Sequence, residues 1–248
     1  MLILGTEIYN ITLSQGLEKA ESFLRDGKQH YIVTSNPEIV LQAKRDVSYR
    51  AILNKADLSI PDGVGLMWAS RVLYGRRCLK ERIAGVDFMY EFLRYVGGST
   101  PALPAGRPHI KVLLLGGRNG VAKKAAVNLK KNFKNVKFYA LEDIDNARKD
   151  FLINEIYKPD CVFVGLGAPR QEKWIYDNIS KYPTVKIAMG VGGSFDFISG
   201  RVRRAPIIFR NIGIEWLWRL VMQPWRAGRI FNAVIFFPLA VLRERAKF

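Results

Sequence analysis

The chain is poor in the residues that build disulfide frameworks and metal centres. Its 248 residues include only two cysteines, Cys78 and Cys161, and two histidines, His30 and His109. Two cysteines cannot form a framework of disulfide bonds, and neither has a further Cys or His nearby at the spacing of metal ligands. The isolated histidines give no support for a catalytic triad. We therefore expect a reducing, cytoplasmic compartment and no metal centre.

Long apolar runs are also missing. No stretch reaches the roughly 18 consecutive apolar residues of a membrane-spanning helix. The longest run extends over 13 residues from Ile230 to Leu242 and is interrupted by Asn232 and Pro238. As a helix it would measure about 20 Å, whereas a hydrocarbon core measures about 30 Å. The first 20 residues lack a basic region followed by an apolar core, so we expect no signal peptide. We expect the apolar run to lie on a membrane rather than cross it.

Acidic residues are few. Lys and Arg number 39 against 22 Asp and Glu, which gives a net charge of +17. Such a charge predicts an anionic partner, which is nucleic acid, an anionic membrane surface or a phosphorylated ligand. A nucleic-acid-binding protein has only this charge in its favour, because no recognition-helix motif accompanies it.

The positive charge is concentrated in residues 201–248. This segment has ten Lys and Arg, nine of them Arg, against Glu215 and Glu244, and it contains three of the five tryptophans. Arginine forms bidentate contacts with phosphate, and tryptophan favours the headgroup region of a membrane. Together with the apolar run, these residues predict a membrane-binding element. The alternative is a terminal helix that packs on the core while its arginines are solvated.

Short apolar runs, each followed by a polar or glycine-containing turn, indicate repeated βα units. They are residues 30–33, 111–115, 160–164 and 186–189. Helix-like stretches follow these turns at several of the runs. This pattern predicts an α/β fold with a Rossmann-like, mostly parallel sheet.

We expect two parts in this chain. Residues 1–196 are predicted to form a Rossmann-like catalytic domain in two halves joined near residues 97–109. That connector has three glycines and three prolines in 13 residues, too many for a helix or a central strand. Residues 197–248 are predicted to form a helical, basic and apolar appendage that associates with a membrane.

A glycine-rich turn follows the run at 111–115. Gly116, Gly117 and Gly120 allow the backbone to approach a phosphate at a helix N-terminus, so this turn is a candidate nucleotide site. A tight turn that needs glycine for packing explains the pattern equally well. The motif lacks the full G-x-G-x-x-G pattern and a convincing acidic ribose ligand, which argues against a nicotinamide-dependent dehydrogenase.

Three polar residues in turns are candidate site residues. Asp62, in Ser-Ile-Pro-Asp-Gly-Val-Gly, is either a general base for a substrate hydroxyl or the cap of a turn or helix. Gln171 follows the run at 160–164, where ligands of parallel sheets bind, and local structure gives little reason for it. Asp196 is open between a ligand contact and a hydrogen bond within its loop.

Taken in series, these segments resemble the WecG/TagA/CpsF family of bacterial glycosyltransferases, and the similarity extends over almost the whole chain. The motifs are Thr-Ser-Asn-Pro at 34–37, Pro-Asp-Gly-Val-Gly at 61–65, Glu-Arg-Ile-Ala-Gly-Val-Asp at 81–87, Gly-Leu-Gly-Ala-Pro-Arg-Gln-Glu at 165–172, Gly-Val-Gly-Gly-Ser-Phe-Asp at 190–196, Arg-Arg-Ala-Pro at 203–206, Gly-Ile-Glu-Trp-Leu-Trp-Arg-Leu at 213–220 and Pro-Trp-Arg at 224–226.

The resemblance implies an inverting transfer of a sugar, typically N-acetylmannosamine, from a UDP-sugar to N-acetylglucosamine on a polyprenyl diphosphate. Such steps build wall teichoic acid and bacterial surface polysaccharides. Relatives that use UDP-glucose or a uronic acid leave the donor open. The resemblance also implies a Rossmann-like core and a C-terminal appendage that binds the cytoplasmic face of the membrane and completes the active site.

The expected partners are therefore a UDP-sugar donor, a polyprenyl-diphosphate-linked acceptor and an anionic membrane surface, and not nucleic acid. The localisation expected is peripheral or monotopic. We expect the chain to lack the Asp-x-Asp metal clamp of many sugar-nucleotide enzymes, which would leave arginines to neutralise the leaving diphosphate, so we expect no cofactor and no metal. Whether the chain forms a homo-oligomer stays open.

The resemblance assigns roles to residues. It implies that Asp62 is the general base and that Arg219, Arg226 and Arg229 contact phosphate. The spacing of these arginines, seven and three, places them near one face of a continuous helix, unless Pro224 interrupts it. The candidate substrate-binding residues are Thr34, Asn36, Arg82, Gly116, Gly117, Gln171, Gly190, Gly192, Asp196 and Arg204.

The chain departs from the family pattern in two places. Gln223 stands before the proline where many relatives have an acidic residue, which weakens any role for a carboxylate there. The apolar tail after Arg229 is longer and more hydrophobic than in soluble relatives, which predicts tighter membrane attachment.

Overall fold

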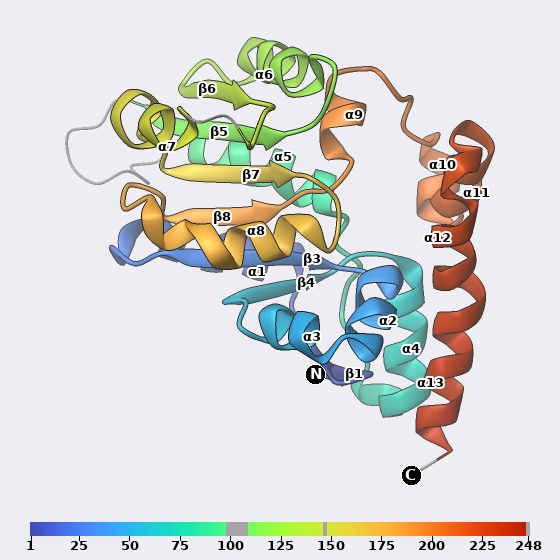
Figure 1. Cartoon of the computed structure of the whole chain (residues 1–248). Coiled ribbons are helices and arrows are strands. Elements are labelled where there is room, and N and C mark those ends of the chain that lie inside the picture. Colours follow the sequence, from blue (N-terminus) through green and yellow to red (C-terminus); the bar gives the residue numbers. More distant parts are fainter. Residues whose placement is uncertain (98–108, 146–147, 247–248) are drawn as a thin grey trace.

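The computed structural model describes residues 1–97, 109–145 and 148–246. Six strands form one parallel sheet in the order β4-β3-β8-β7-β5-β6, and Figure 1 shows them side by side. The strands are β3 (His30–Ser35), β4 (Leu58–Pro61), β5 (Ile110–Gly116), β6 (Val136–Leu141), β7 (Cys161–Gly165) and β8 (Ile187–Gly190), and a separate antiparallel ribbon pairs β1 (Leu2–Ile3) with β2 (Thr6–Glu7). The predicted α/β fold is confirmed.

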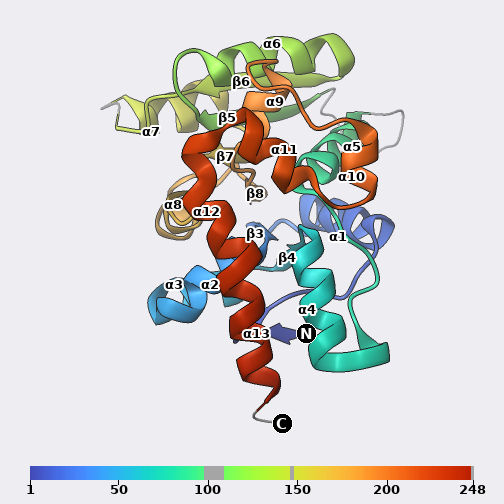
Figure 2. The same cartoon turned by 90° about the vertical axis from the view of Figure 1, so that its right-hand side faces the viewer.

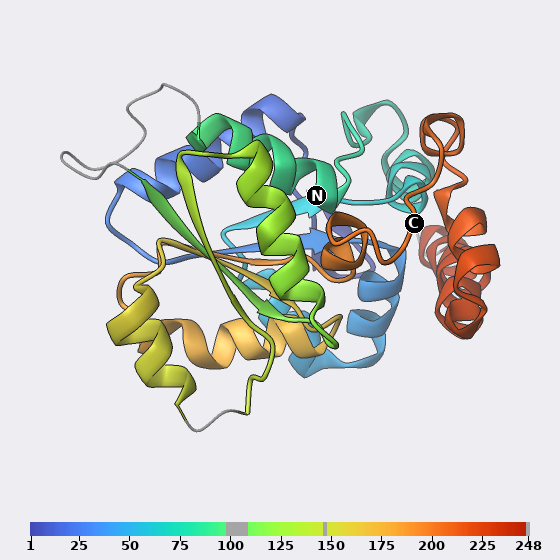
Figure 3. The ribbon, with the colours of Figure 1, turned by 90° about the horizontal axis from the view of Figure 1, so that it is seen from above.

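Helices cover both faces of the sheet, and Figure 3 shows the two layers from above. Both faces are buried, as parallel sheets require. In β5, for example, Val112 and Leu114 belong to one apolar core, and Leu113 and Leu115 belong to the other. The first core includes α1 (Leu13–Arg25), α5 (Gly85–Gly97), α6 (Val121–Asn132) and α9 (Ser194–Ile198), and the second includes α2 (Pro37–Arg45), α3 (Val47–Asn54), α8 (Arg170–Asn178) and η2 (Leu152–Tyr157), which continues α7 (Lys149–Phe151).

All four strands predicted from the sequence exist, with ends that differ by at most two residues. Neither β4 nor β6 was predicted. β4 has only four residues, and β6 is an edge strand whose Lys137 is exposed, so neither gives a clear apolar signal. The predicted connector at 97–109 lies almost wholly outside the described residues.

The carboxyl ends of the strands meet at one edge of the sheet. Parallel register pairs Ser35 with Pro61, Gly116 with Gly165, and Val164 with Gly190. β8 lies between β3 and β7, so the late strand joins the two halves of the chain into one sheet. Loops that follow these ends therefore gather at the edge where ligands of open α/β sheets bind.

A column of helices stands beside this edge (Figures 1 and 2). We call α10 to α13, residues 207–245, the C-terminal appendage. The predicted domain boundary after residue 196 falls within α9. The appendage comprises α10 (Ile207–Asn211), α11 (Glu215–Met222), η4 (Pro224–Arg226), α12 (Ala227–Phe231), η5 (Asn232–Phe236) and α13 (Phe237–Arg245), and it faces α4 (Val64–Tyr74), which η1 (Gly75–Arg77) follows; η3 (Ile179–Lys181) extends α8.

The second half of the appendage is one helix from Pro224 to Arg245. Its 22 residues measure about 33 Å, so the expected 20 Å element is too short. The predicted length counted the apolar residues alone, whereas the helix also includes the flanking arginines. Pro238 does not end the helix, because it lies in the first turn of α13, directly after the π-helical segment η5. By length and composition this helix is able to cross a membrane, and only 11% of its most apolar window is buried.

The packing of this helix shows how it is used. Phe237 and Val241 are fully buried in a third apolar core, together with Val40 of α2 and Leu66 and Ala69 of α4. The helix thus lies lengthwise on α2 and α4 with one face packed and the other exposed.

Candidate active site

A cleft of about 1330 Å³ lies between the carboxyl edge of the sheet and the C-terminal appendage. Its floor comes from the loops after β3, β4, β5, β7 and β8, and its other wall comes from α4, α11 and the helix that starts at Pro224. Of the candidate residues from the sequence, all but Gly116 and Gly190 line this cleft. Residues more than 150 positions apart therefore meet at one site.

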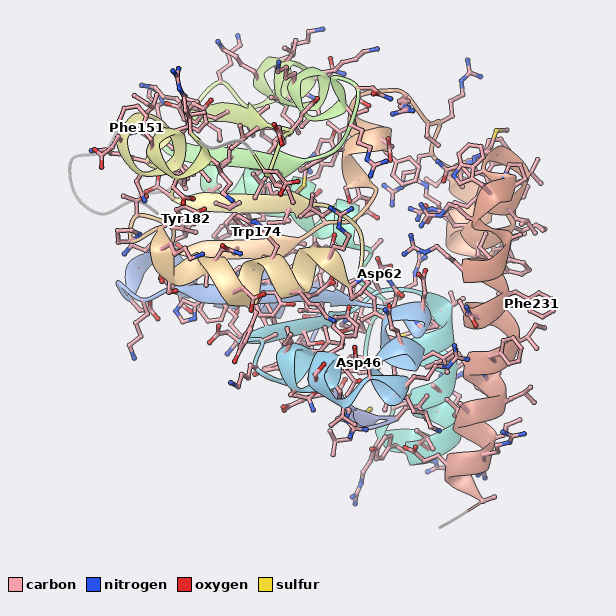
Figure 4. All side chains as sticks on the ribbon, in the orientation of Figure 1. Asp46, Asp62, Phe151, Trp174, Tyr182 and Phe231 are labelled. Carbon is pink, nitrogen blue, oxygen red and sulfur yellow. The ribbon has the colours of Figure 1, made fainter. Side chains whose placement is uncertain are left out.

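Asp62 directly follows β4 and faces the appendage, as Figure 4 shows. Its backbone N–H donates to the Ser35 carbonyl at 2.7 Å, and its Oδ2 accepts from the Gly85 N–H at 3.2 Å. Gly63 holds the N-cap position of α4, so the carboxylate is not the cap of that helix. The carboxylate instead joins the β4 turn to the start of α5.

The surroundings of Asp62 make it a stronger base than an ordinary aspartate. Burial raises the pKa of the Asp62 carboxyl, and the negative charge of Glu215 adds to this, whereas the Gly85 N–H and the positive charges of Arg219 and Arg82 oppose it. The net effect is a raised pKa, which suits proton abstraction from a hydroxyl.

Two other predicted residues use their oxygens within the fold. The Thr34 hydroxyl, at the end of β3, donates to the Gly190 carbonyl at 3.1 Å. Asn36 caps α2, since its Oδ1 accepts from the Ile39 N–H at 3.1 Å. Both line the cleft and stiffen its floor beside Asp62.

Gln171 has a clear structural task, contrary to the sequence-based expectation that local structure needs it little. It is 2% exposed, and its Oε1 accepts from the N–H groups of Gly167, at 3.1 Å, and Gly192, at 2.9 Å. Its Nε2 donates to Glu172 Oε1 at 2.7 Å. A Cβ on Gly190 would lie 2.8 Å from this nitrogen, which explains that glycine. Gln171 therefore locks together the loops after β7 and β8.

The predicted phosphate turn is already occupied by a side chain. Glu142 accepts from the N–H groups of Gly120 at 2.9 Å and Ala122 at 3.0 Å, at the N-terminus of α6. Gly116 serves packing, because a Cβ there would lie 2.7 Å from Leu166 Cδ2. Gly117 does line the cleft. Of the two interpretations, a phosphate site or a packing turn, the structure supports the packing turn for Gly116. The N-terminus of α6 already binds the carboxylate of Glu142.

The appendage arginines reach the cleft from three different elements. Arg219 lies on α11, Arg226 on η4 and Arg229 on α12, and the chain turns at Gln223 between α11 and the long helix. The prediction that the three arginines share one face of a continuous helix is therefore wrong, because the helix is interrupted at Gln223, before Pro224. All three arginines nevertheless line the same cleft.

Positive charge accumulates at this wall of the cleft. Burial lowers the pKa of Arg226, and the nearby charges of Arg219 and Arg229 lower it further. Arg229 pairs with Glu38 of α2, while the Arg219 guanidinium lies 4.7 Å from the centre of the Phe197 ring. The cations at this wall repel one another, and an anion bound between them would reduce the repulsion.

Arg82 and Arg204 border the cleft through contacts with other parts of the fold. Arg82 donates to the Arg210 carbonyl at 3.1 Å. Arg204 pairs with Asp87 of α5 and lies 3.9 Å from Glu215. Although burial opposes ionisation of Asp87, the hydrogen bond and charge of Arg204 hold the pKa of that carboxyl below its ordinary value. Sequence reasoning missed Glu215 as a site residue, although it lies within one of the motifs.

The opposite end of the cleft is acidic. Asp143 and Asp145, which form an Asp-x-Asp sequence, line it beside Glu142. The Asp145 N–H donates to Asp143 Oδ1 at 3.0 Å, so these residues form a local turn. Within residues 1–97, 109–145 and 148–246, no group of three or more His, Cys, Asp or Glu is placed to hold a metal ion. Asp196 also lines the cleft, and its carbonyl accepts from the Val202 N–H at 3.1 Å.

Comparison with known proteins agrees with this architecture. The family model described as "Glycosyl transferase WecG/TagA/CpsF family" matches residues 1–248. Two relatives named N-acetylglucosaminyldiphosphoundecaprenol N-acetyl-beta-D-mannosaminyltransferase, from Staphylococcus aureus strains MRSA252 and MW2, are each 34% identical over 250 residues, which cover 99% of this chain and 94% of the relative. The protein of the same name from strain NCTC 8325 is 33% identical over the same share. The chain thus belongs to the WecG/TagA/CpsF family of glycosyltransferases.

Proposed function

We propose that the protein transfers N-acetylmannosamine from a UDP-sugar to N-acetylglucosamine on a polyprenyl diphosphate, with inversion at the anomeric carbon. The observation that carries this proposal is the placement of Asp62, a carboxyl of raised pKa, in the same cleft as three appendage arginines. One group is suited to remove a proton and the others to hold phosphate. The acceptor and the sugar are those named for the staphylococcal relatives.

The transfer follows from this arrangement. Asp62 takes the proton of an acceptor hydroxyl as that oxygen attacks the anomeric carbon from the face opposite the diphosphate. The new carbon–oxygen bond forms while the bond to the UDP oxygen breaks, and the electron pair leaves with UDP. Attack from the opposite face inverts the configuration. Asp62 is left protonated and later loses its proton to water.

The appendage arginines supply the charge stabilisation. A leaving diphosphate gains negative charge in the transition state, and fixed cations at that position lower the barrier. Arg219, Arg226 and Arg229 would hold it, with Arg226 beside Gly193 of the loop after β8. These cations make a metal-independent reaction the expected one.

The outer surface of the appendage suits a membrane. Large apolar side chains are exposed on it in a number unusual for a soluble surface. We propose that this surface rests peripherally on the cytoplasmic face of the cell membrane, where a UDP-sugar is available to a lipid-linked acceptor. The exposed apolar residues are Ile207, Ile208, Ile212, Val221, Trp225, Phe231, Phe236, Leu239 and Leu242.

Two further parts of the account stand as proposals. Residues 1–196 form the catalytic domain and 197–248 the membrane-associating part, although Ile198 still packs in the core. The substrate-binding set carries over with three changes: Gln171 and Gly190 support the floor of the cleft and Gly116 packs against Leu166. Arg82, Gly192 and Asp196 line the cleft.

The direct test is the release of UDP by the purified full-length protein in detergent. The acceptor is a short-chain N-acetylglucosaminyl diphosphate lipid, and the donors are UDP-N-acetylmannosamine, UDP-N-acetylglucosamine, UDP-glucose and a UDP-uronic acid. The proposal predicts acceptor-dependent release with UDP-N-acetylmannosamine. Release with UDP-glucose or the uronic acid instead would keep the reaction and replace the donor. No release with any donor would refute the proposal.

A further inference from the structure

The pocket-facing side of α4 is unusually apolar and open. Val64 and Trp68 lie one helical turn apart, both line the cleft, and both are 39% exposed. Arg71 is the single charged residue in the 11 residues of α4. Neither the catalytic proton transfer nor the arginine wall uses this strip of apolar surface.

The fold holds this strip firmly beside the proposed base. Val64 follows Asp62 by two positions, and a Cβ on Gly213, in the turn before α11, would lie 2.4 Å from Val64 Cγ1. On the other side, a Cβ on Gly65 would lie 2.6 Å from the Pro37 ring. The N-terminus of α4 is therefore clamped between α2 and the appendage. Trp68 lies about 6 Å further along the helix axis.

The appendage contributes further apolar side chains to this cleft. Val234 and Pro238 of the long helix and Trp216 of α11 line the same cleft as Val64 and Trp68. Figure 2 looks onto this side of the molecule and shows α4 beside the α13 end of the long helix and below α11. The exposed apolar residues of the appendage belong to the elements that frame this opening. The cleft thus continues from a charged interior to an apolar exit.

We propose that the apolar strip of Val64 and Trp68, together with Val234 and Pro238 of the same cleft, binds the first isoprenoid units of the lipid acceptor. This inference rests on the proposed function. A ligand that joins a polar sugar diphosphate to a long apolar chain matches a cleft in which the proposed base, Asp62, is followed by an exposed apolar strip. The uracil of the donor is also able to stack on an indole, so the proposal requires that Trp68→Ser leave the Kd for UDP unchanged.

The position of the strip also gives it a function in the membrane. When the exposed face of the appendage rests on lipid, a chain that leaves the cleft over Trp68, beside the packed contact between α4 and α13, enters the bilayer without crossing water. The enzyme would then recognise the chain near the diphosphate and leave the remainder in lipid. Selection for a polyprenyl over a short alkyl acceptor would follow from the contact with Trp68.

The first experiment compares two acceptors in detergent, N-acetylglucosaminyl diphosphates of a polyprenyl chain and of a short alkyl chain. We expect the ratio of kcat/KM for the long over the short chain to fall about tenfold in Trp68→Ser and to recover in Trp68→Phe, because an apolar contact of that size is lost and then restored. Phe151→Ser is the matched control. Phe151 is 58% exposed, does not line the cleft and lies far from the appendage in Figure 4, so this variant should keep the wild-type ratio.

The second experiment needs no variant. An acceptor with a diazirine on its first isoprenoid unit is photolysed with the full-length protein on vesicles, and the labelled peptide is identified by mass spectrometry. The proposal predicts label within residues 64–71 or 230–238. Label confined to residues 207–212, or an unchanged chain-length ratio in Trp68→Ser, would overturn it. Failure of the wild-type protein to use either acceptor would instead overturn the proposed function, and the chain site with it.

Discussion

The guanidinium of Arg204 forms a bidentate ion pair with the carboxylate of Asp87, with Nη2 2.7 Å from Oδ2 and Nη1 2.5 Å from Oδ1. Asp87 lies in the first turn of α5, and Arg204 lies in the segment that leads into the appendage. The Arg204 Nε is 3.9 Å from Glu215 Oε1, which is in turn 3.8 Å from Arg219 Nη2. A chain of four alternating charges therefore ties the appendage to α5 beside Asp62.

Glu215 is predicted to set the basicity of Asp62. Its negative charge helps to raise the pKa of the Asp62 carboxyl, so Glu215→Gln should lower that pKa. Because the base acts when deprotonated, activity rises with pH through its pKa. The acid limb of the kcat/KM profile should move to lower pH, with a lower plateau from the weaker base.

Glu244→Gln is the matched control for this profile. Glu244 is on α13, does not line the cleft, and lies 4.0 Å from Lys44, a surface contact. An acid limb that stays in place in Glu215→Gln would contradict the assigned link between the two carboxylates. A fall in kcat/KM by the same factor at every pH would instead mean that Glu215 acts only through the position of Arg219.

Gln171 is predicted to support the cleft rather than to bind substrate. Gln171→Ala leaves the N–H groups of Gly167 and Gly192 without their partner and removes a donor from buried Glu172. We expect a loss of about 1–3 kcal/mol in the free energy of unfolding and a fall in Tm of several degrees.

Thermal unfolding of Gln171→Ala beside Lys173→Ala tests this role. Lys173 is on the same helix, and its exposed pair with Asp46, at 3.6 Å, contributes little. If Gln171→Ala kept the wild-type Tm while KM for the donor rose, Gln171 would be a substrate ligand after all.

Arg226 is predicted to contact the diphosphate of the donor. Its positive charge is crowded by Arg219 and Arg229, and an anion would relieve that repulsion. Loss of a charge-assisted hydrogen bond in Arg226→Ala should weaken UDP binding by about 10- to 100-fold, and Arg226→Lys should recover part of it.

Calorimetry of UDP binding, with Arg243→Ala as control, checks this prediction. Arg243 is exposed and lies outside the cleft. Unchanged affinity in Arg226→Ala would exclude the phosphate role.

Turnover should also withstand EDTA. A loss of activity in EDTA that Mg²⁺ restores would turn attention to Asp143 and Asp145, the Asp-x-Asp pair at the acidic end of the cleft.

Local patterns were sufficient to predict the architecture. The four apolar runs became β3, β5, β7 and β8, because a strand buried on both faces is visible in a few consecutive residues. β4 was not visible in this way, although Asp62 depends on it. The length of the long helix was also missed, because its arginines and Pro238 interrupt the apolar count without ending the helix.

The positions of the candidate site were predictable, mainly through the family motifs, but the hydrogen-bond and ion-pair partners of each side chain were not. Gln171 bonds to Gly192, 21 positions away, and Arg204 pairs with Asp87, 117 positions away. Nothing in the local sequence reports such partners. Glu142 accepts a hydrogen bond at the N-terminus of α6, yet it comes after both that helix and the whole of β6 in the sequence.

Asp62→Asn tests the central claim of this account most directly. The variant keeps the size of the side chain and removes the base. We expect turnover of UDP-N-acetylmannosamine with the lipid acceptor to fall at least about 10³-fold, while the Kd for the donor stays within about twofold.

The stability of this variant has a predicted sign as well. Because the pKa of Asp62 is raised in the folded state, its stabilising contribution is fully present below the pKa of the unfolded chain and is lost as pH rises through the folded pKa. An uncharged Asn avoids this cost at neutral pH, so Tm should be equal or higher. Turnover near the wild-type rate, or equal loss of donor binding and turnover with a lower Tm, would show that Asp62 is a structural residue and not the base.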